Sequence, residues 1–136
     1  MKNSFIGYIT SRSYLEERTP QHIQNKVIRD FCAEKNFFFN LSATEHRING
    51  CFKVFEGVVG DLKKDLYDGI VSYSLFQLPE DDIVRKDLVF QVLKKKKRIF
   101  CVVENLKITS MEEFYHADIM FRLKKISNIN NPDFKF

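Results

Sequence analysis

Short apolar runs alternate along the chain with longer segments in which apolar residues recur every three or four positions. The runs cover residues 4–10, 37–41, 67–74 and 98–104. Each is rich in β-branched or aromatic residues and flanked by polar ones, which is typical of buried strands. The segments with helical spacing cover residues 21–36, 51–65, 80–97 and 111–126. The pattern therefore predicts a strand and then a helix, four times over.

This order predicts an α/β protein. We expect a single-domain, three-layer sandwich with a mostly parallel four-stranded sheet and helices on both faces, a Rossmann-like arrangement. A length of 136 residues suits one domain, which we expect to span residues 1–127. Residues 128–136 are rich in turn formers and are expected to be a flexible C-terminal tail.

Several helix ends carry recognisable signals. Asn36 is expected to close the first helix, and Ser110 with Glu113 predicts a capping box at the start of the last one. The segment 80–97 begins with three acidic residues and ends with four lysines, an order that suits the helix macrodipole. The expected apolar face of the first helix consists of Ile23, Val27, Ile28, Phe31 and Cys32.

Composition and charge narrow the class of protein. A formal net charge of +4 allows an anionic partner without demanding one. No apolar run reaches the length of a membrane span, and the apolar stretch near the start is too short for a signal peptide, so we expect a cytoplasmic protein with no membrane partner. Cys32, Cys51 and Cys101 lie in apolar surroundings without CxxC spacing and are expected to be buried free thiols. No histidine has a second ligand at metal spacing, so no metal or cofactor is expected.

In an open parallel sheet, ligands bind beyond the carboxyl ends of the strands, and two long polar loops come after the first two expected strands. The first loop carries Thr10, Ser11, Arg12 and Ser13. Hydroxyls and a guanidinium ahead of a helix favour anion binding, although the loop lacks the glycines of a P-loop or a dinucleotide motif. The alternative is that these residues only cap and solvate the loop.

The second loop carries Glu45, His46 and Arg47. Histidine exchanges protons near neutral pH, so Glu45 with His46 is the candidate catalytic pair and Arg47 a candidate anion ligand. A solvated charged turn is the alternative.

Two further segments have both a structural and a functional interpretation. The run from Lys94 to Arg98 favours nucleic-acid binding only weakly, because it also closes a helix that begins with acidic residues. The segment 111–126 has more apolar residues than one sheet contact needs, so it either belongs wholly to the core or forms a homodimer seam.

Several of these pieces resemble the catalytic domain of small serine recombinases, the resolvase and invertase type. The resemblance rests on 6-IGYITS-11, on Glu45 to Phe55, and on 68-DGIVSYSLFQLPED-81, and it spans about residues 4–108. It implies a resolvase-like fold, with a catalytic serine at the end of the first strand flanked by arginines that bind the scissile phosphate.

The chain departs from that family at the residues that would do the chemistry. In register from Tyr8, Thr10 takes the place of the first arginine and Arg12 that of the serine. Phe76, Gln77 and Glu80 fall where an aspartate and two arginines belong. Losing even one preorganised charge donor costs about 3 kcal/mol of transition-state stabilisation, so we expect no recombinase activity.

The phrases 5-FIGYITSR-12, 21-QHIQNKVIRDFC-32 and 69-GIVSYSLFQLP-79 are also similar to a sporadic carbohydrate cluster family of small resolvase-like proteins. That resemblance implies a cytoplasmic role in bacterial surface-carbohydrate biosynthesis. We then expect the strand ends to bind an anionic sugar or nucleotide sugar through Tyr8, Ser11, Arg12, Ser13, Arg47, Tyr73 and Gln77. Whether a sugar-modifying reaction takes place there stays open. The alternatives are a non-catalytic homodimeric scaffold that pairs through residues 111–126, and DNA binding without cleavage.

Overall fold

The structure, a computed structural model, describes residues 3–11, 18–46 and 52–129. In chain order the elements are β1 (Ser4–Thr10), α1 (Gln21–Lys35), β2 (Phe38–Glu45), α2 (Lys53–Lys63), β3 (Gly69–Ser72), the 3-10 turn η1 (Leu75–Gln77), α3 (Asp82–Lys94), β4 (Arg98–Cys101), β5 (Leu106–Ile108) and α4 (Met111–Ile129).

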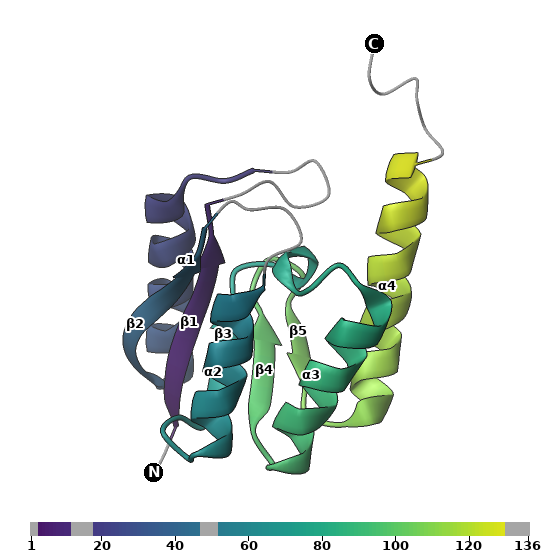
Figure 1. Cartoon of the computed structure of the whole chain (residues 1–136). Helices are drawn as coiled ribbons and strands as arrows, with labels where there is room; N and C mark the ends of the chain where they lie inside the picture. Colours follow the sequence, from purple (N-terminus) through teal and green to yellow (C-terminus); the bar gives the residue numbers. More distant parts are fainter. Residues whose placement is uncertain (1–2, 12–17, 47–51, 130–136) are drawn as a thin grey trace.

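The strands form one sheet in the order β2-β1-β3-β4-β5 (Figure 1). The first four strands are parallel, which confirms the mostly parallel prediction, whereas β5 runs antiparallel to β4. The four-strand prediction was therefore wrong by one. The extra strand has only three residues, too few to show a strand period, and the chain reverses into it at Asn105, whose φ of 54° is left-handed.

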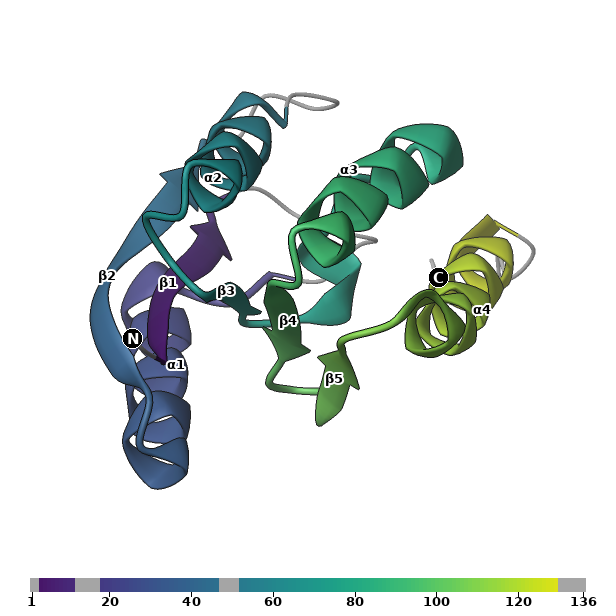
Figure 2. The same ribbon diagram turned by 90° about the horizontal axis from the view of Figure 1, so that it is seen from below.

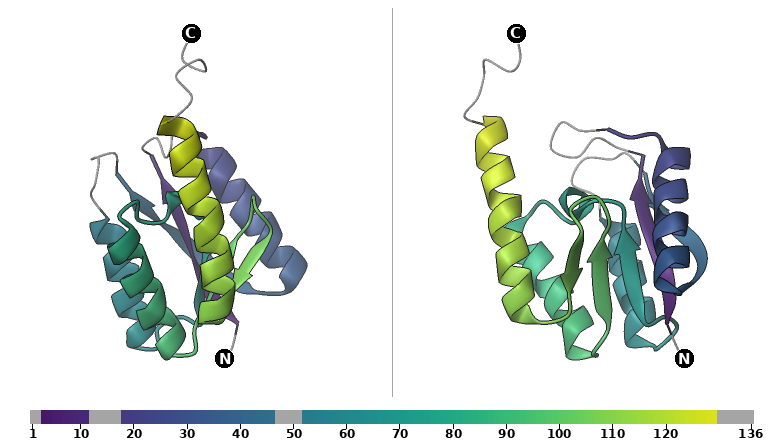
Figure 3. Two further views of the ribbon diagram at one scale, coloured as in Figure 1. Left: turned by 90° about the vertical axis from the view of Figure 1, so that its right-hand side faces the viewer. Right: turned by 180° about the vertical axis from the view of Figure 1, so that it is seen from behind.

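Helices cover both faces of the sheet, but unequally. Seen from below, α1 lies on one face while α2 and α3 lie on the other (Figure 2). The last helix, α4, stands beside the β5 edge, as the two side views in Figure 3 also show. The predicted three-layer sandwich is thus present in outline, with a single helix in one outer layer.

Two hydrophobic clusters hold these layers together. The larger one joins the sheet to α2, α3 and α4 and includes Phe55, Leu62, Val89 and Phe121. The smaller one lies under α1 and contains stacked and edge-on aromatic rings, with the rings of Phe5 and Phe37 4.2 Å apart. Offset and edge-on aromatic pairs stabilise a core beyond the area that they bury.

The predicted helix ends are largely confirmed. Asn36 adopts the left-handed conformation (φ 62°) that closes α1. At the start of α4 the backbone N–H of Glu113 donates to the Ser110 hydroxyl, while the Glu113 carboxylate reaches back to the N–H of Thr109. That reach goes one residue further than in a standard capping box. The last helix also extends to Ile129, so the first two residues of the expected tail are helical, and residues 130–136 lie outside the described range.

The buried face of α1 is rotated relative to the prediction. Its buried residues are Gln24, Ile28 and Cys32, whereas Ile23 is 42% exposed. A buried glutamine in place of an isoleucine means that polar contacts, not only packing, fix this helix on the sheet.

Two of the three cysteines confirm the expectation of buried free thiols. Cys32 and Cys101 are both free and buried, and burial raises the pKa of the Cys32 thiol to about 11. Burial also raises the pKa of Cys101. Cys51 lies outside the described residues. Among the described helices, none is long and apolar enough to cross a membrane.

Candidate functional site

The carboxyl ends of β1, β2 and β3 meet at the upper edge of the sheet in Figure 1. Strand register places Thr10 beside Glu45 and Tyr8 beside Ser72. Thr10 and Glu45, which were predicted from separate loops, are therefore brought to one edge, as the parallel topology requires.

Glu45 is the centre of the first polar group at this edge. Its carboxylate is 1% exposed and accepts hydrogen bonds from the Tyr8 hydroxyl at 2.9 Å and from the backbone N–H groups of Val54 and Phe55 at 3.2 and 3.1 Å. Those two N–H groups belong to the first turn of α2, whose own capping residue, Phe52, makes no side-chain hydrogen bond to them. A carboxylate at a helix N-terminus satisfies orphan donors and complements the macrodipole. Glu45 thus caps α2 from the neighbouring strand.

Ser11 follows Thr10 and His46 follows Glu45, so each lies one residue beyond the last paired position of β1 and β2. The N–H of Ser11 donates to the Glu45 carbonyl at 3.0 Å, so the chain leaves β1 still paired with β2. Successive side chains of an extended chain alternate sides, and His46 is accordingly exposed where Glu45 is buried. The pair proposed for proton transfer therefore occupies two different environments, and its catalytic role stays a prediction.

A second polar group joins α1 to the turn after β3. The Gln24 side chain, fully buried, donates to the carbonyls of Thr10 and Thr19 and accepts from the N–H of Thr10. Its carbonyl oxygen also accepts from the Gln77 amide at 2.8 Å. Gln77, a predicted ligand-binding residue, is likewise fully buried, so its amide holds η1 against α1.

Glu104 anchors the other end of the same turn. Its carboxylate accepts from the N–H of Leu75 at 2.7 Å and from the Ser74 hydroxyl at 2.8 Å. A charge-assisted bond to a backbone N–H is stronger than a neutral one. The turn after β3 is therefore fixed to α1 on one side and to the β4–β5 connection on the other.

Arg85 fixes the segment between η1 and α3. The residue is 0% exposed, and its guanidinium donates to the carbonyls of Pro79 and Glu80 and to the carboxylates of Asp82 and Asp118. The guanidinium also lies 3.8 Å from the centre of the Phe121 ring. A planar fork of five donors can serve several acceptors at once, which lysine cannot do. One side chain thus ties the η1–α3 loop, the start of α3 and the middle of α4.

The remaining predicted site residues divide into two sets. Tyr73 is half-buried against the cluster under α1, on the other face of the sheet from Tyr8. Arg12, Ser13 and Arg47 lie outside the described residues. The structure therefore brings together Tyr8, Ser11, Glu45 and His46 at the ends of β1 and β2, and places Gln77 in the interior nearby.

Three polar residues that organise this edge were missed. Gln24 shares its helix face with Ile28 and Cys32 at intervals of four, a spacing that could have revealed it. Arg85 precedes the buried Val89 by four residues and obeys the same rule. Glu104 has a weaker signal, since it only comes shortly after a strand.

Most of the polar side chains described at this edge make hydrogen bonds that hold the fold together, and few of them are accessible to solvent. The carboxylates of Glu45 and Glu104 and the Gln24 amide all hold backbone groups of neighbouring elements. Within the described ranges, Ser11 and His46 are the predicted site residues at the ends of β1 and β2 that solvent reaches. No cluster of potential metal ligands occurs in the part of the chain that the structure describes.

Comparisons with known proteins bear on the fold. No protein-family model matches the chain, and no curated protein matches it in sequence. Among solved structures, the N-terminal catalytic domain of TP901-1 integrase is similar with a TM-score of 0.63 and 13% identity, over 90% of this chain and 95% of that one. A resolvase family site-specific recombinase from Streptococcus pneumoniae is similar with a TM-score of 0.59 and 13% identity, over 96% of this chain and 97% of that one. The chain therefore has the resolvase-like α/β fold of these recombinase domains.

Proposed function

We propose that this chain is a non-catalytic scaffold protein that forms a homodimer through α4. The observation that carries the proposal is an exposed apolar stripe on that helix. Tyr115, Ile119, Leu123 and Ile126 recur at intervals of four, four and three residues, and each is about half exposed. Helical residues at this spacing share one side, so the four side chains form a continuous strip.

The stripe is separate from the surface that α4 uses within the domain. The helix packs inward through Phe114, Ala117 and Phe121, which are almost fully buried. Core packing therefore does not account for the apolar residues on the other side. Contiguous exposed apolar surface on a soluble protein marks an interaction site more often than chance exposure does.

Charge along α4 favours a second copy as the partner. The helix begins with Glu112 and Glu113, and its basic residues, Arg122, Lys124 and Lys125, lie toward the other end. Two such helices packed antiparallel about a two-fold axis place the acidic end of each beside the basic end of the other. An isologous interface requires this kind of self-complementarity.

The neighbouring surface of α3 can extend the contact. A cavity of about 450 Å³ lies between α3 and α4, and its lining includes Ile83, Phe90 and Arg122. Ile83 is 81% exposed, so this flank presents an apolar side chain among the charged Asp82, Lys86 and Asp87. An apolar side chain from a partner helix would fill such a cavity and bury both surfaces.

The turn after β3 supports the non-catalytic part of the proposal. In the recombinase family that the sequence resembles, this turn is expected to hold charged groups facing the phosphate. Here Gln77 faces Gln24, and the carbonyls of Pro79 and Glu80 accept from Arg85. The Gln77 amide and these two carbonyls are engaged in holding the fold.

The test is the mass of the protein in solution at tens of micromolar, measured by light scattering. We expect a dimer for the natural sequence and a monomer for Leu123→Glu, because a charge in each copy would be buried at the centre of the interface. Leu41→Glu is the matched control, since Leu41 is 52% exposed on β2, at the opposite edge of the sheet. A monomeric natural protein, or a dimer that Leu123→Glu leaves intact, would reject the proposal.

A second candidate is binding of an anionic sugar or nucleotide sugar at the carboxyl ends of β1 and β2, in a surface-carbohydrate pathway. It is favoured by the adjacent, solvent-accessible Ser11 and His46, which directly precede Arg12 and Arg47 in the sequence. A thermal-shift panel of nucleotide sugars and sialic-type acids tests it. A shift with one sugar class that is lost in Arg47→Ala supports the candidate, and a flat panel rejects it.

A further inference from the structure

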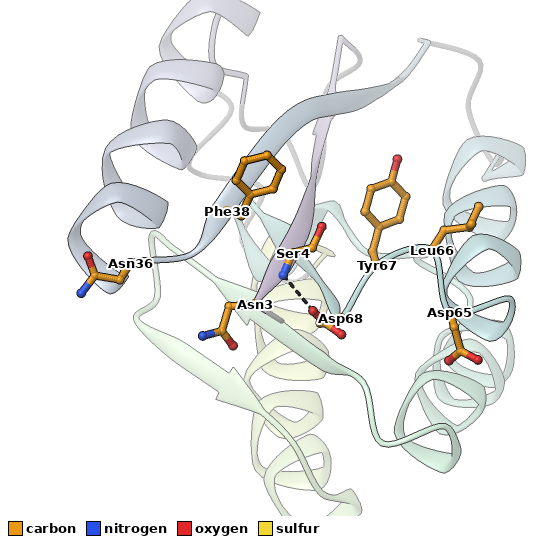
Figure 4. Close-up of a pocket in the computed structure, with 8 residues that line it drawn as sticks. All are labelled: Asn3, Ser4, Asn36, Phe38, Asp65, Leu66, Tyr67 and Asp68. Atoms are coloured by element: carbon orange, nitrogen blue, oxygen red, sulfur yellow. Dashed lines mark hydrogen bonds between the residues drawn. The ribbon is translucent and has the colours of Figure 1, made fainter. Parts of the chain in front are cut away.

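The amino end of the sheet carries a cavity that the proposed function does not use. It has a volume of about 620 Å³ and opens beside the starts of β1, β2 and β3 (Figure 4). The residues that line it include Asn3, Ser4, Phe38, Asp65, Tyr67 and Asp68. The three helices α1, α2 and α3 end around it, because helices that connect parallel strands run back to this end.

Two aromatic side chains form opposite walls of the cavity. Phe38 starts β2 and is 66% exposed, while Tyr67 precedes β3 and is half-buried. The start of β1 lies between them, since Ser4 pairs with Phe38 on one side and its carbonyl accepts from the N–H of Asp68 on the other. Adjacent strands lie about 4.8 Å apart, so the two walls rise from backbones about 10 Å apart. Figure 4 shows the two rings on either side of Ser4.

The floor of the cavity offers polar groups that the fold leaves available. Within the described part of the chain, the hydroxyls of Ser4 and Tyr67 have no hydrogen-bond partner. Asp68 accepts from the Ser4 N–H with Oδ2 only, at 2.8 Å, so its other oxygen can accept from the N–H donors of a bound ring.

Basic side chains are attached directly to the rim. Lys97 Nζ lies 2.9 Å from the Asp65 carboxylate and Lys95 Nζ lies 4.0 Å from it. Arg98 donates to the Asn3 side chain at 2.9 Å, while its guanidinium lies 4.9 Å from the centre of the Phe5 ring in the cluster under α1. The run from Lys94 to Arg98, which sequence analysis also explained as a solvated helix end, therefore borders an aromatic cavity.

Helix ends alone do not account for the basic charge at this end. Three helix C-termini contribute partial charges of about −0.5 each, and the cavity lining adds the carboxylates of Asp65 and Asp68. The exposed lysines at the same end extend beyond the run, and they are Lys35, Lys63, Lys64, Lys94, Lys95 and Lys96. The surplus positive charge suits a phosphate near the aromatic walls.

We propose that this cavity binds a nucleotide, with the base between Phe38 and Tyr67 and the phosphate toward Lys95 and Lys97. Stacking on aromatic faces combined with a basic border is how proteins hold single nucleotides and unpaired strands. A neutral sugar would use the rings but not the border, and duplex DNA would use the border but not the rings. The site lies at the other end of the sheet from the Ser11–His46 margin and does not include the apolar stripe of α4.

The test measures binding of two probes to the full chain, a mononucleotide by calorimetry and a short single strand of nucleic acid by fluorescence anisotropy. We expect Phe38→Ala to weaken binding at least tenfold and Phe38→Tyr to retain it, because tyrosine keeps the stacking face. Leu41→Ala is the matched control, since Leu41 is an exposed apolar residue on the same strand outside this cavity, and it should bind normally. Lys95→Ala should weaken binding and flatten its dependence on salt.

The two probes distinguish the source of the nucleotide. Similar affinity for both supports a free nucleotide as the ligand, whereas a tighter, salt-sensitive affinity for the strand supports an unpaired nucleic-acid segment. Three results would overturn the proposal: no binding of either probe at millimolar concentration, unchanged binding by Phe38→Ala, or equal binding of duplex and single strand. The dimer proposal is tested separately, because Phe38→Ala leaves the α4 stripe intact.

Discussion

The two ends of the sheet use their polar residues in opposite ways. At the carboxyl end, Glu45 caps α2, Gln24 holds β1 to η1, and Glu104 holds the start of η1. At the amino end, the hydroxyls of Ser4 and Tyr67 face a cavity instead. The rule that ligands bind at the carboxyl ends of parallel strands describes where backbone geometry opens a crevice. It does not guarantee that the side chains there remain available.

Burial separates the structural polar residues of one end from the binding residues proposed at the other. Glu45, Gln24 and Gln77 are each at most 1% exposed, and each completes hydrogen bonds of the fold. Phe38 is 66% exposed and completes none with its side chain. Substitution of Glu45, Gln24 or Gln77 should therefore lower stability, and substitution of Phe38 should change binding alone.

The largest effect is expected for Arg85→Met. This change leaves the Pro79 carbonyl and Oδ1 of Asp118 without their donor in a buried setting, whereas Lys125 still donates to the Glu80 carbonyl. Removing one partner of a buried ion pair costs about 3–5 kcal/mol in the free energy of unfolding. Urea unfolding measures the change. Arg122→Met is the control, because Arg122 contacts the same Asp118 from an exposed position and should change the free energy little. Equal losses for the two variants would show that burial is not what sets the effect.

A smaller loss is expected for Glu45→Gln. The amide keeps one acceptor oxygen but loses the second acceptor and the charge that complements the N-terminus of α2. Hydrogen bonds to charged groups contribute about 1.5–3 kcal/mol, so we expect a loss of about 2 kcal/mol in the free energy of unfolding. Glu34→Gln, at an exposed position on α1, is the comparison. If Glu45→Gln were as stable as the natural sequence, the Glu45 carboxylate would not be needed to hold the fold. The proposed difference between the two ends of the sheet would then be wrong.

The smallest effect is expected for Phe38→Ala at the amino end. An exposed side chain has little buried area to lose, so the free energy of unfolding should stay within about 0.5 kcal/mol of the natural value. The same denaturation curves give this value. A loss of several kcal/mol would mean that Phe38 belongs to the core, and it would remove the main argument for a binding role.

The fold class could be predicted because the spacing of apolar residues is a local signal, and it shows the order of strands and helices along the chain. The runs at 4–10 and 98–104 and the helical segments between them all correspond to elements of the structure. The antiparallel β5 could not be predicted, because three residues carry no period and their pairing depends on the turn at Asn105.

The candidate site was only partly predictable, for a different reason. The sequence identified Glu45 as an ionisable residue at a strand end, but its partners, the N–H groups of Val54 and Phe55, lie nine and ten residues further along the chain, and no local pattern links them to Glu45. The amino-end cavity was missed altogether. Its residues come from the starts of three strands, and each segment alone resembles an ordinary strand boundary.

The Arg85 guanidinium has a consequence for how the molecule opens. Because it joins the η1–α3 loop, the first turn of α3 and the middle of α4, none of the three can separate from the others without breaking bonds to this one side chain. Amide hydrogens in these segments should then exchange with solvent at similar rates, as members of one cooperative unit. We therefore expect α4, although it stands at the edge of the sheet, to open together with the core and not to unfold independently.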